Sequence, residues 1–99
     1  MDDATLHERL ATLADQLAAT AERPVETTAS RWLGEAEAVA TDLADGAVDR
    51  EVVAERIGHV RRLLREVEGT GDETADDHVA EAREIARSIE SALTDRDDE

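Results

Sequence analysis

Apolar residues recur along this chain at the three- and four-residue spacing of an amphipathic α-helix, and no stretch alternates like a β-strand. Four stretches have this spacing, and they predict helices at about residues 5–23, 28–45, 49–68 and 73–93. The connections between them are short, so consecutive helices must run antiparallel. The pattern therefore predicts an all-α fold, an up-down-up-down antiparallel four-helix bundle, in a single domain of residues 1–99 with a frayed acidic tail at 94–99.

Each predicted helix has one apolar stripe, which we expect to face the bundle core. In chain order the stripes are Leu6, Leu10, Leu13 and Leu17; Trp32, Ala36, Val39 and Leu43, flanked by Leu33 and Ala40; Val53, Ile57, Val60, Leu64 and Val67; and Val79, Ala82, Ala86, Ile89 and Leu93, with Ile85 beside them. Trp32 is the only aromatic residue. We expect it to fill the core between the first two helices, or else to anchor a contact between subunits.

Residues with capping preferences mark the predicted N-terminal ends. The candidates are Thr5, in a capping box with Glu8, then Thr27 or Thr28, and Asp49. Thr74 and Asp77 resemble a further cap, which would start the fourth helix at Ala75 instead.

Proline and glycine mark the predicted C-terminal ends. Pro24 ends the first helix, Gly46 is placed for a left-handed residue after the second, and Gly69 ends the third. Gly34 and Gly58 lie inside predicted helices, where each costs about 1 kcal/mol relative to alanine. Close approach of a neighbouring helix would explain them, and a tolerated kink is the alternative.

Composition predicts a marginal core. Of the 99 residues 40% are hydrophobic, but 18 are alanine, whose burial contributes little. We therefore expect salt or a second subunit to supply the missing stability. Larger apolar residues beside the stripes widen the apolar faces, and with Trp32 they are the candidate interface of a homodimer: Trp32, Leu33, Val52, Leu63 and Ile85.

The charge is extreme, with 26 acidic residues, 11 arginines, no lysine and a formal net charge of −15. Such a chain repels itself at low ionic strength, whereas molar salt shortens the Debye length to about 3 Å and screens that repulsion. We therefore expect a cytoplasm of very high salt. The alternative is an acidic mesophilic protein from a GC-rich genome, where arginine codons displace lysine codons.

Several classes of protein are disfavoured. The absence of cysteine excludes disulfides and thiol catalysis. No apolar run is long enough for a membrane span or a signal peptide, so the expected location is cytoplasmic, without membrane contact. We also expect no nucleic-acid binding, because the overall field repels phosphates and no aromatic residues accompany the arginines.

Arginines concentrate in the second half of the third helix, at Arg61, Arg62 and Arg65. Around them, residues 46–68 carry five acids and five arginines, whereas residues 69–99 have a net charge of −8. This candidate charge patch could bind an acidic partner or a phosphate. The alternative is that the arginines pair with acids on the fourth helix, or locally, as Arg62 can with Glu66.

No catalytic, cofactor-binding or metal-ligating set emerges from the sequence. His7, His59 and His78 lie one each on three helices, but the chain has no Glu-x-x-His motif of the kind used by di-iron bundles. The many carboxylates show no sign of a cleft that would split their pKa values. The sequence therefore favours a protein without enzymatic activity and without cofactors.

Several short motifs resemble those of one class of protein. They are Arg31-Trp32-Leu33-Gly34-Glu35-Ala36-Glu37-Ala38, His59-Val60-Arg61-Arg62-Leu63-Leu64, Gly69-Thr70-Gly71 and Ala75-Asp76-Asp77-His78-Val79. Over residues 5–93 the chain resembles small acidic haloarchaeal conserved hypothetical proteins, helical domains of unknown function. The resemblance implies a helical domain and a halophilic cytoplasm, and it implies no activity and no site residues.

Two functions follow as hypotheses. The first is a helical interaction or structural module of a halophilic cytoplasm that self-associates and performs no catalysis. The alternative is an acidic regulator that binds the basic surface of an unidentified protein through the fourth helix and the tail at 94–99.

Overall fold

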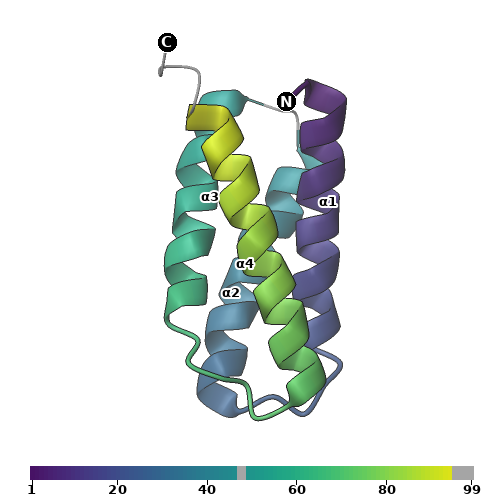
Figure 1. The fold of residues 1–99 in the computed structure, drawn as a ribbon, viewed down its shortest axis with the longest axis vertical. Helices are drawn as coiled ribbons and strands as arrows, with labels where there is room; N and C mark the ends of the chain where they lie inside the picture. The colour runs from purple at the N-terminus through teal and green to yellow at the C-terminus, as the bar shows by residue number, and fades with distance from the viewer. Residues whose placement is uncertain (47–48, 95–99) are drawn as a thin grey trace.

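The computed structural model describes residues 1–46 and 49–94, which form four helices (Figure 1). They are α1 (Asp3–Thr20), α2 (Thr27–Asp45), α3 (Arg50–Arg65) and α4 (Glu73–Thr94). Among the described residues the helices contact one another in a ring, α1 and α3 each packing against α2 and α4, without contacts across either diagonal. The predicted all-α, up-down four-helix bundle is confirmed. Most of the predicted tail, residues 95–99, and residues 47–48 of the second connection lie outside the described residues.

The apolar stripes of α1, α3 and α4 form the core as predicted. All four leucines of α1 are fully buried, as are Ile57 and Val60 of α3 and Ile89 of α4. Two residues placed beside the stripes, Leu63 and Ile85, are buried as well.

The predicted stripe of α2 is half confirmed. Ala36 and Leu43 are buried, but Trp32 and Val39 are only partly buried, against the edge of the core. The buried residues of this helix are Ala29, Leu33, Ala36, Ala40 and Leu43. The buried face is thus rotated about the helix axis toward Leu33 and Ala40, and alanine occupies three of its five positions.

The predicted start and end of α1 need correction. The helix begins earlier because the Oδ1 atom of Asp2 accepts the Thr5 amide proton at a donor–acceptor distance of 2.8 Å. Asp2 is thus the N-cap, and the capping box of Thr5 with Glu8 is wrong. The helix ends at Thr20, four residues before Pro24. A turn follows, in which the amides of residues 21–23 each donate to the carbonyl three residues earlier.

The ends of α2 and α3 also differ from expectation. Glu26 occupies the N-cap position of α2 without a side-chain hydrogen bond, instead of Thr27 or Thr28, and Gly46 is extended (φ −95°) instead of left-handed. The Asp49 cap of α3 is confirmed, because its side chain accepts hydrogen bonds from the amides of Glu51 and Val52. The helix stops at Arg65, three residues before the predicted end, although Val67 remains buried.

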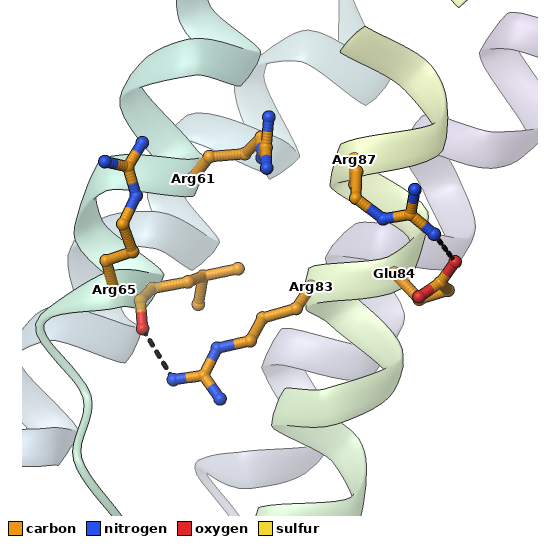
Figure 2. Close-up of a pocket in the computed structure, with 6 residues that line it drawn as sticks. Arg61, Arg65, Arg83, Glu84 and Arg87 are labelled. Atoms are coloured by element: carbon orange, nitrogen blue, oxygen red, sulfur yellow. Dashed lines mark hydrogen bonds and ion pairs between the residues drawn. The ribbon is translucent and has the colours of Figure 1, made fainter. Parts of the chain in front are cut away.

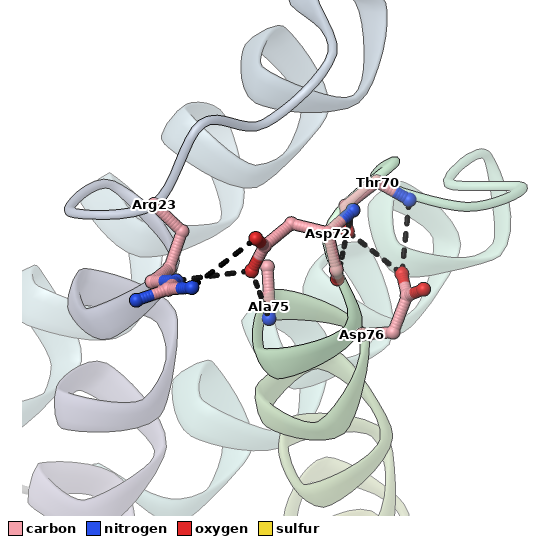
Figure 3. Close-up of polar contacts among 5 residues, drawn as sticks. All are labelled: Arg23, Thr70, Asp72, Ala75 and Asp76. Carbon is pink, nitrogen blue, oxygen red and sulfur yellow. Dashed lines mark hydrogen bonds and ion pairs between the residues drawn. The ribbon is translucent and has the colours of Figure 1, made fainter.

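A polar network joins the connection before α4 to the end of α1 (Figure 3). The Asp72 carboxylate caps α4 by accepting the Ala75 amide at 2.9 Å, and it accepts two bonds from the Arg23 guanidinium at 3.0 and 3.3 Å. The predicted cap of Thr74 and Asp77 is therefore wrong. The turn itself needs a left-handed residue at Gly71 (φ +82°), not at Gly69.

Thr70 lies at the centre of this network and is fully buried. Its hydroxyl lies 2.8 Å from both the Asp76 carboxylate and the Asp72 carbonyl, and its amide donates to Asp76 at 2.9 Å. Its carbonyl accepts the Glu26 amide at 2.8 Å. Both connections at this end of the bundle are thereby joined.

The two glycines inside helices have different surroundings. A Cβ atom at Gly34 would meet nothing within 4 Å, so the expected close helix approach is wrong there. At Gly58 a Cβ atom would lie 3.3 Å from the Glu90 carboxylate, the movable end of a side chain from α4.

Replacement of Gly34 by alanine therefore tests a free site in a helix. We expect Gly34→Ala to stabilise the protein by about 1 kcal/mol, since alanine restricts the unfolded chain and meets no neighbour. Thermal unfolding should show a midpoint about 4–8 °C higher. An unchanged or lower midpoint would contradict the open surroundings of Gly34.

The network around Thr70 predicts a dependence of stability on pH. Arg23 and the Ala75 amide lower the pKa of Asp72 from its ordinary 3.8, and the Thr70 hydroxyl and amide lower the pKa of Asp76. Because both folded-state pKa values are depressed, the stabilisation is complete above pH 3.8 and is lost as the pH falls through the lowered values.

Chemical unfolding of the Asp72→Asn/Asp76→Asn variant should show this loss. We expect wild type to exceed the variant in free energy of unfolding near neutral pH, and the difference to shrink below pH 3.8. Asp77→Asn is the control, because Asp77 is exposed and has no hydrogen-bond partner among the described residues. If the difference in free energy of unfolding between wild type and variant stayed constant until both carboxylates were protonated, the stabilising role of Asp72 and Asp76 would be contradicted.

Candidate functional site

The structure separates the five predicted interface residues into two groups. Leu33, Leu63 and Ile85 are at most 9% exposed and belong to the core of a single chain. They are therefore not surplus apolar surface, because the neighbouring helices already cover them. Val52 is 42% exposed, and Trp32 is partly buried against the core.

Trp32 lies in an open groove of about 380 Å³ between the start of α2 and the end of α3. Three glutamates line the same groove, Glu26, Glu66 and Glu68. Val39, two helical turns after Trp32, lies on the same side of α2. At the opposite end of these two helices, a second groove includes Val52 beside Leu43. The exposed or partly buried large apolar residues of α2 and α3 thus lie along the face that these helices share.

Four arginines line an open groove of about 200 Å³ on the other side of α3, against α4. Figure 2 shows Arg61 and Arg83 extending into the space between the two helices, whereas Arg87 turns toward Glu84 and Arg65 turns away from α4. We call this open groove the arginine groove; its lining residues are Arg61, Leu64, Arg65, Arg83, Glu84 and Arg87. Two predicted patch residues, Arg61 and Arg65, belong to it. Arg62 lies on the exposed surface outside it.

The partners of these arginines differ. Arg61 forms an ion pair with Glu90 of α4, as the structural interpretation of the patch predicted. Arg87 forms an exposed ion pair with Glu84, three residues earlier on its own helix. Arg62 and Arg65 have no hydrogen-bond or ion-pair partner within residues 1–46 and 49–94, so the predicted pair of Arg62 with Glu66 does not form.

Arg83 has a structural task that the sequence did not reveal. Its Nη2 atom donates to the carbonyl oxygens of Leu64 and Val67, at 2.8 and 2.7 Å. It thereby satisfies two carbonyls at the C-terminal end of α3, where a cation also complements the helix dipole. The C-terminal end of α3 is thus capped by a side chain from another helix. The only sequence signal for this contact was the spacing of Arg83 and Arg87, which lie one helical turn apart.

Charge is distributed unevenly among the four helices. The neutral 49–68 segment of the sequence becomes a cationic helix once its ends are defined, because α3 carries five arginines against two glutamates, a net charge of +3. The other helices are anionic, with −2 on α1, −3 on α2 and −4 on α4. Together α2 and α3 are neutral, whereas α1 and α4 sum to −6.

The three histidines do not converge. His7 is exposed near the start of α1, and His59 is partly buried on α3. The Nδ1 atom of His78 lies 2.8 Å from the Oε1 atom of Gln16, near the other end of α1. Among the described residues, no group of three or more His, Cys, Asp or Glu side chains is placed to hold a metal ion. Nor does any described helix have the length and apolar character to cross a membrane.

Arg83→Gln tests the tertiary cap of α3. We expect a loss of about 1–2 kcal/mol in the free energy of unfolding, because two carbonyls lose a charged donor. Chemical denaturation measures it. The matched control is Arg87→Gln, which removes the same charge one turn away and should cost less than about 0.5 kcal/mol, since its ion pair is exposed. Equal losses in the two variants would contradict the capping role.

Comparison with known proteins gives a family and no activity. No curated protein and no solved structure matches the chain. The family model described as a domain of unknown function, DUF8152, matches residues 9–96. With most of its length inside that match, the chain belongs to the DUF8152 family.

Proposed function

We propose that this protein is a non-enzymatic helical interaction module of a high-salt cytoplasm, and that it self-associates through the face shared by α2 and α3. One observation carries the proposal. Within α1 and α4 every leucine, isoleucine and valine is buried, whereas α2 and α3 leave Trp32, Val39 and Val52 partly or largely accessible. The large apolar side chains that remain accessible on the helices therefore lie on α2 and α3.

Electrostatics favours the same face. Two copies of a chain with a net charge of −15 repel each other at long range. Summed over their whole length, α2 and α3 have no net charge, although three glutamates line the groove at Trp32. Molar salt would screen what repulsion remains, in keeping with the proposed high-salt cytoplasm.

A two-fold dimer would use this face twice. In such a contact the same residues of both copies form the interface, so each residue contributes to the binding free energy twice. Trp32 is suited to be the anchor, because tryptophan is enriched among residues that dominate binding energy.

Val52→Glu tests the proposed contact. We expect sedimentation velocity in about 3 M KCl to show a concentration-dependent dimer for the wild type. The variant should weaken the dimer by about tenfold or more, because the lost burial and the added charge occur on both sides of a two-fold contact. Ala80→Glu is the matched control, since it adds the same charge to an exposed alanine of α4. A wild-type monomer at high micromolar concentration would overturn the proposal.

A second candidate function rests on the charge of α4. With a net charge of −4, this helix could bind the basic surface of another protein and regulate it. Such binding would be retained in Val52→Glu and would weaken steeply as salt rises. Pull-down at physiological KCl distinguishes this function from self-association, because it would recover a basic partner and not a second copy of the chain.

A further inference from the structure

The arginine groove brings together two pairs of like charges. Arg61 and Arg65 are four residues apart on α3, and Arg83 and Arg87 are four residues apart on α4. Like charges at this spacing destabilise a helix, and here the two pairs line one groove from opposite sides (Figure 2). This clustering of like charges stands out in a chain whose 26 acidic residues outnumber its 11 basic residues.

Neighbouring carboxylates neutralise the groove only in part. Glu90 pairs with Arg61, and Glu84 pairs with Arg87. Asp76, beside Arg83, adds a third negative charge close to the four guanidinium groups. Arg65 has no partner among the described residues. One arginine of the groove therefore stays uncompensated on a molecule that is strongly negative as a whole.

Arg83 prepares the groove for an anion. A helix C-terminus carries partial negative charge, and α3 ends at the groove. The Arg83 guanidinium donates to two carbonyls there and is held in place by them. The negative end of α3 is thereby compensated. Arg65 remains unpaired among the described residues, and Arg61 and Arg87 would have to share their guanidinium groups between a ligand and their glutamates.

We propose that the arginine groove binds the phosphate group of a small phosphorylated molecule. The planar guanidinium fork matches the geometry of phosphate oxygens, and an anion would compensate the positive charge that the groove retains. The open volume of about 200 Å³ admits a phosphate group with a short organic substituent. A nucleic acid or an acidic protein is disfavoured, since its many charges would meet the net −15 of this chain.

Titration with inorganic phosphate, followed by amide and arginine Nε signals in two-dimensional NMR, tests this site. Sodium chloride at equal ionic strength separates binding from screening. We expect phosphate to cause saturable shifts confined to residues 61–65 and 83–87. The proposal would be overturned if sodium chloride caused the same shifts as phosphate, or if the shifts were spread over the whole surface.

Two matched variants sharpen the test. Arg65→Gln should weaken phosphate binding about fivefold to tenfold, the usual scale for one charge-assisted hydrogen bond. Arg62→Gln removes the same charge from the same helix outside the groove, and it should change the affinity less than twofold. Equal effects of the two variants would reduce the site to general electrostatic attraction and overturn it.

A third arm identifies the class of ligand. A glutamate hexapeptide offers carboxylates in place of phosphate. Saturation by glycerol phosphate but not by the peptide supports the proposal. The reverse order of affinity would overturn it and assign the groove to an acidic protein partner. The Val52→Glu variant should bind phosphate like the wild type, so failure of the groove and failure of self-association are distinguishable.

Discussion

Alanine at the buried positions of α2 and α4 is the constraint on which the rest of this bundle depends. Three of the five buried positions of α2 are alanines, and α4 buries alanine at positions 75, 82 and 86. The diagonal partners α1 and α3 supply leucine, isoleucine and valine instead. Small side chains of one diagonal and large side chains of the other thus combine in one core, the alternation by which packed layers interdigitate.

The same constraint bears on what remains outside. Small alanines occupy the inner positions of α2, and Trp32 lies at the edge of the core beside α3. Val39 follows on the same side of α2, and Val52 of α3 is left exposed. The α2–α3 face therefore carries the large apolar side chains that the core does not take up.

Much of the fold was readable from the sequence, and the failures have physical causes. Stripes of large residues determined the buried faces of α1, α3 and α4, because each offers one dominant phase. In α2, Trp32 and Val39 lie on one flank and Leu33 and Ala40 on the other, so only packing against neighbours could select the phase.

The helix ends and the site were harder to predict for related reasons. Several residues with capping preference lie near each end, and the local pattern does not rank them. Asp2 and Asp72 cap their helices through bonds from amides three residues later, and Asp72 is also held by the distant Arg23. Arg83 acts on carbonyls sixteen and nineteen residues away, which no local pattern reveals. The patch on α3 was visible as a run of arginines, but Arg87 and Arg83 joined it only when α4 was placed beside α3.

The two sides of α3 are used differently, and this has a consequence for the proposed interactions. Val52 lies on the side toward α2, whereas Arg61 and Arg65 lie on the side toward α4. Because the residues of α3 between them are buried in the core, a contact on one side does not have to disturb the other. A second copy on the α2–α3 face would leave the arginine groove open to solvent. A phosphorylated ligand and a partner chain could then occupy the same helix at once.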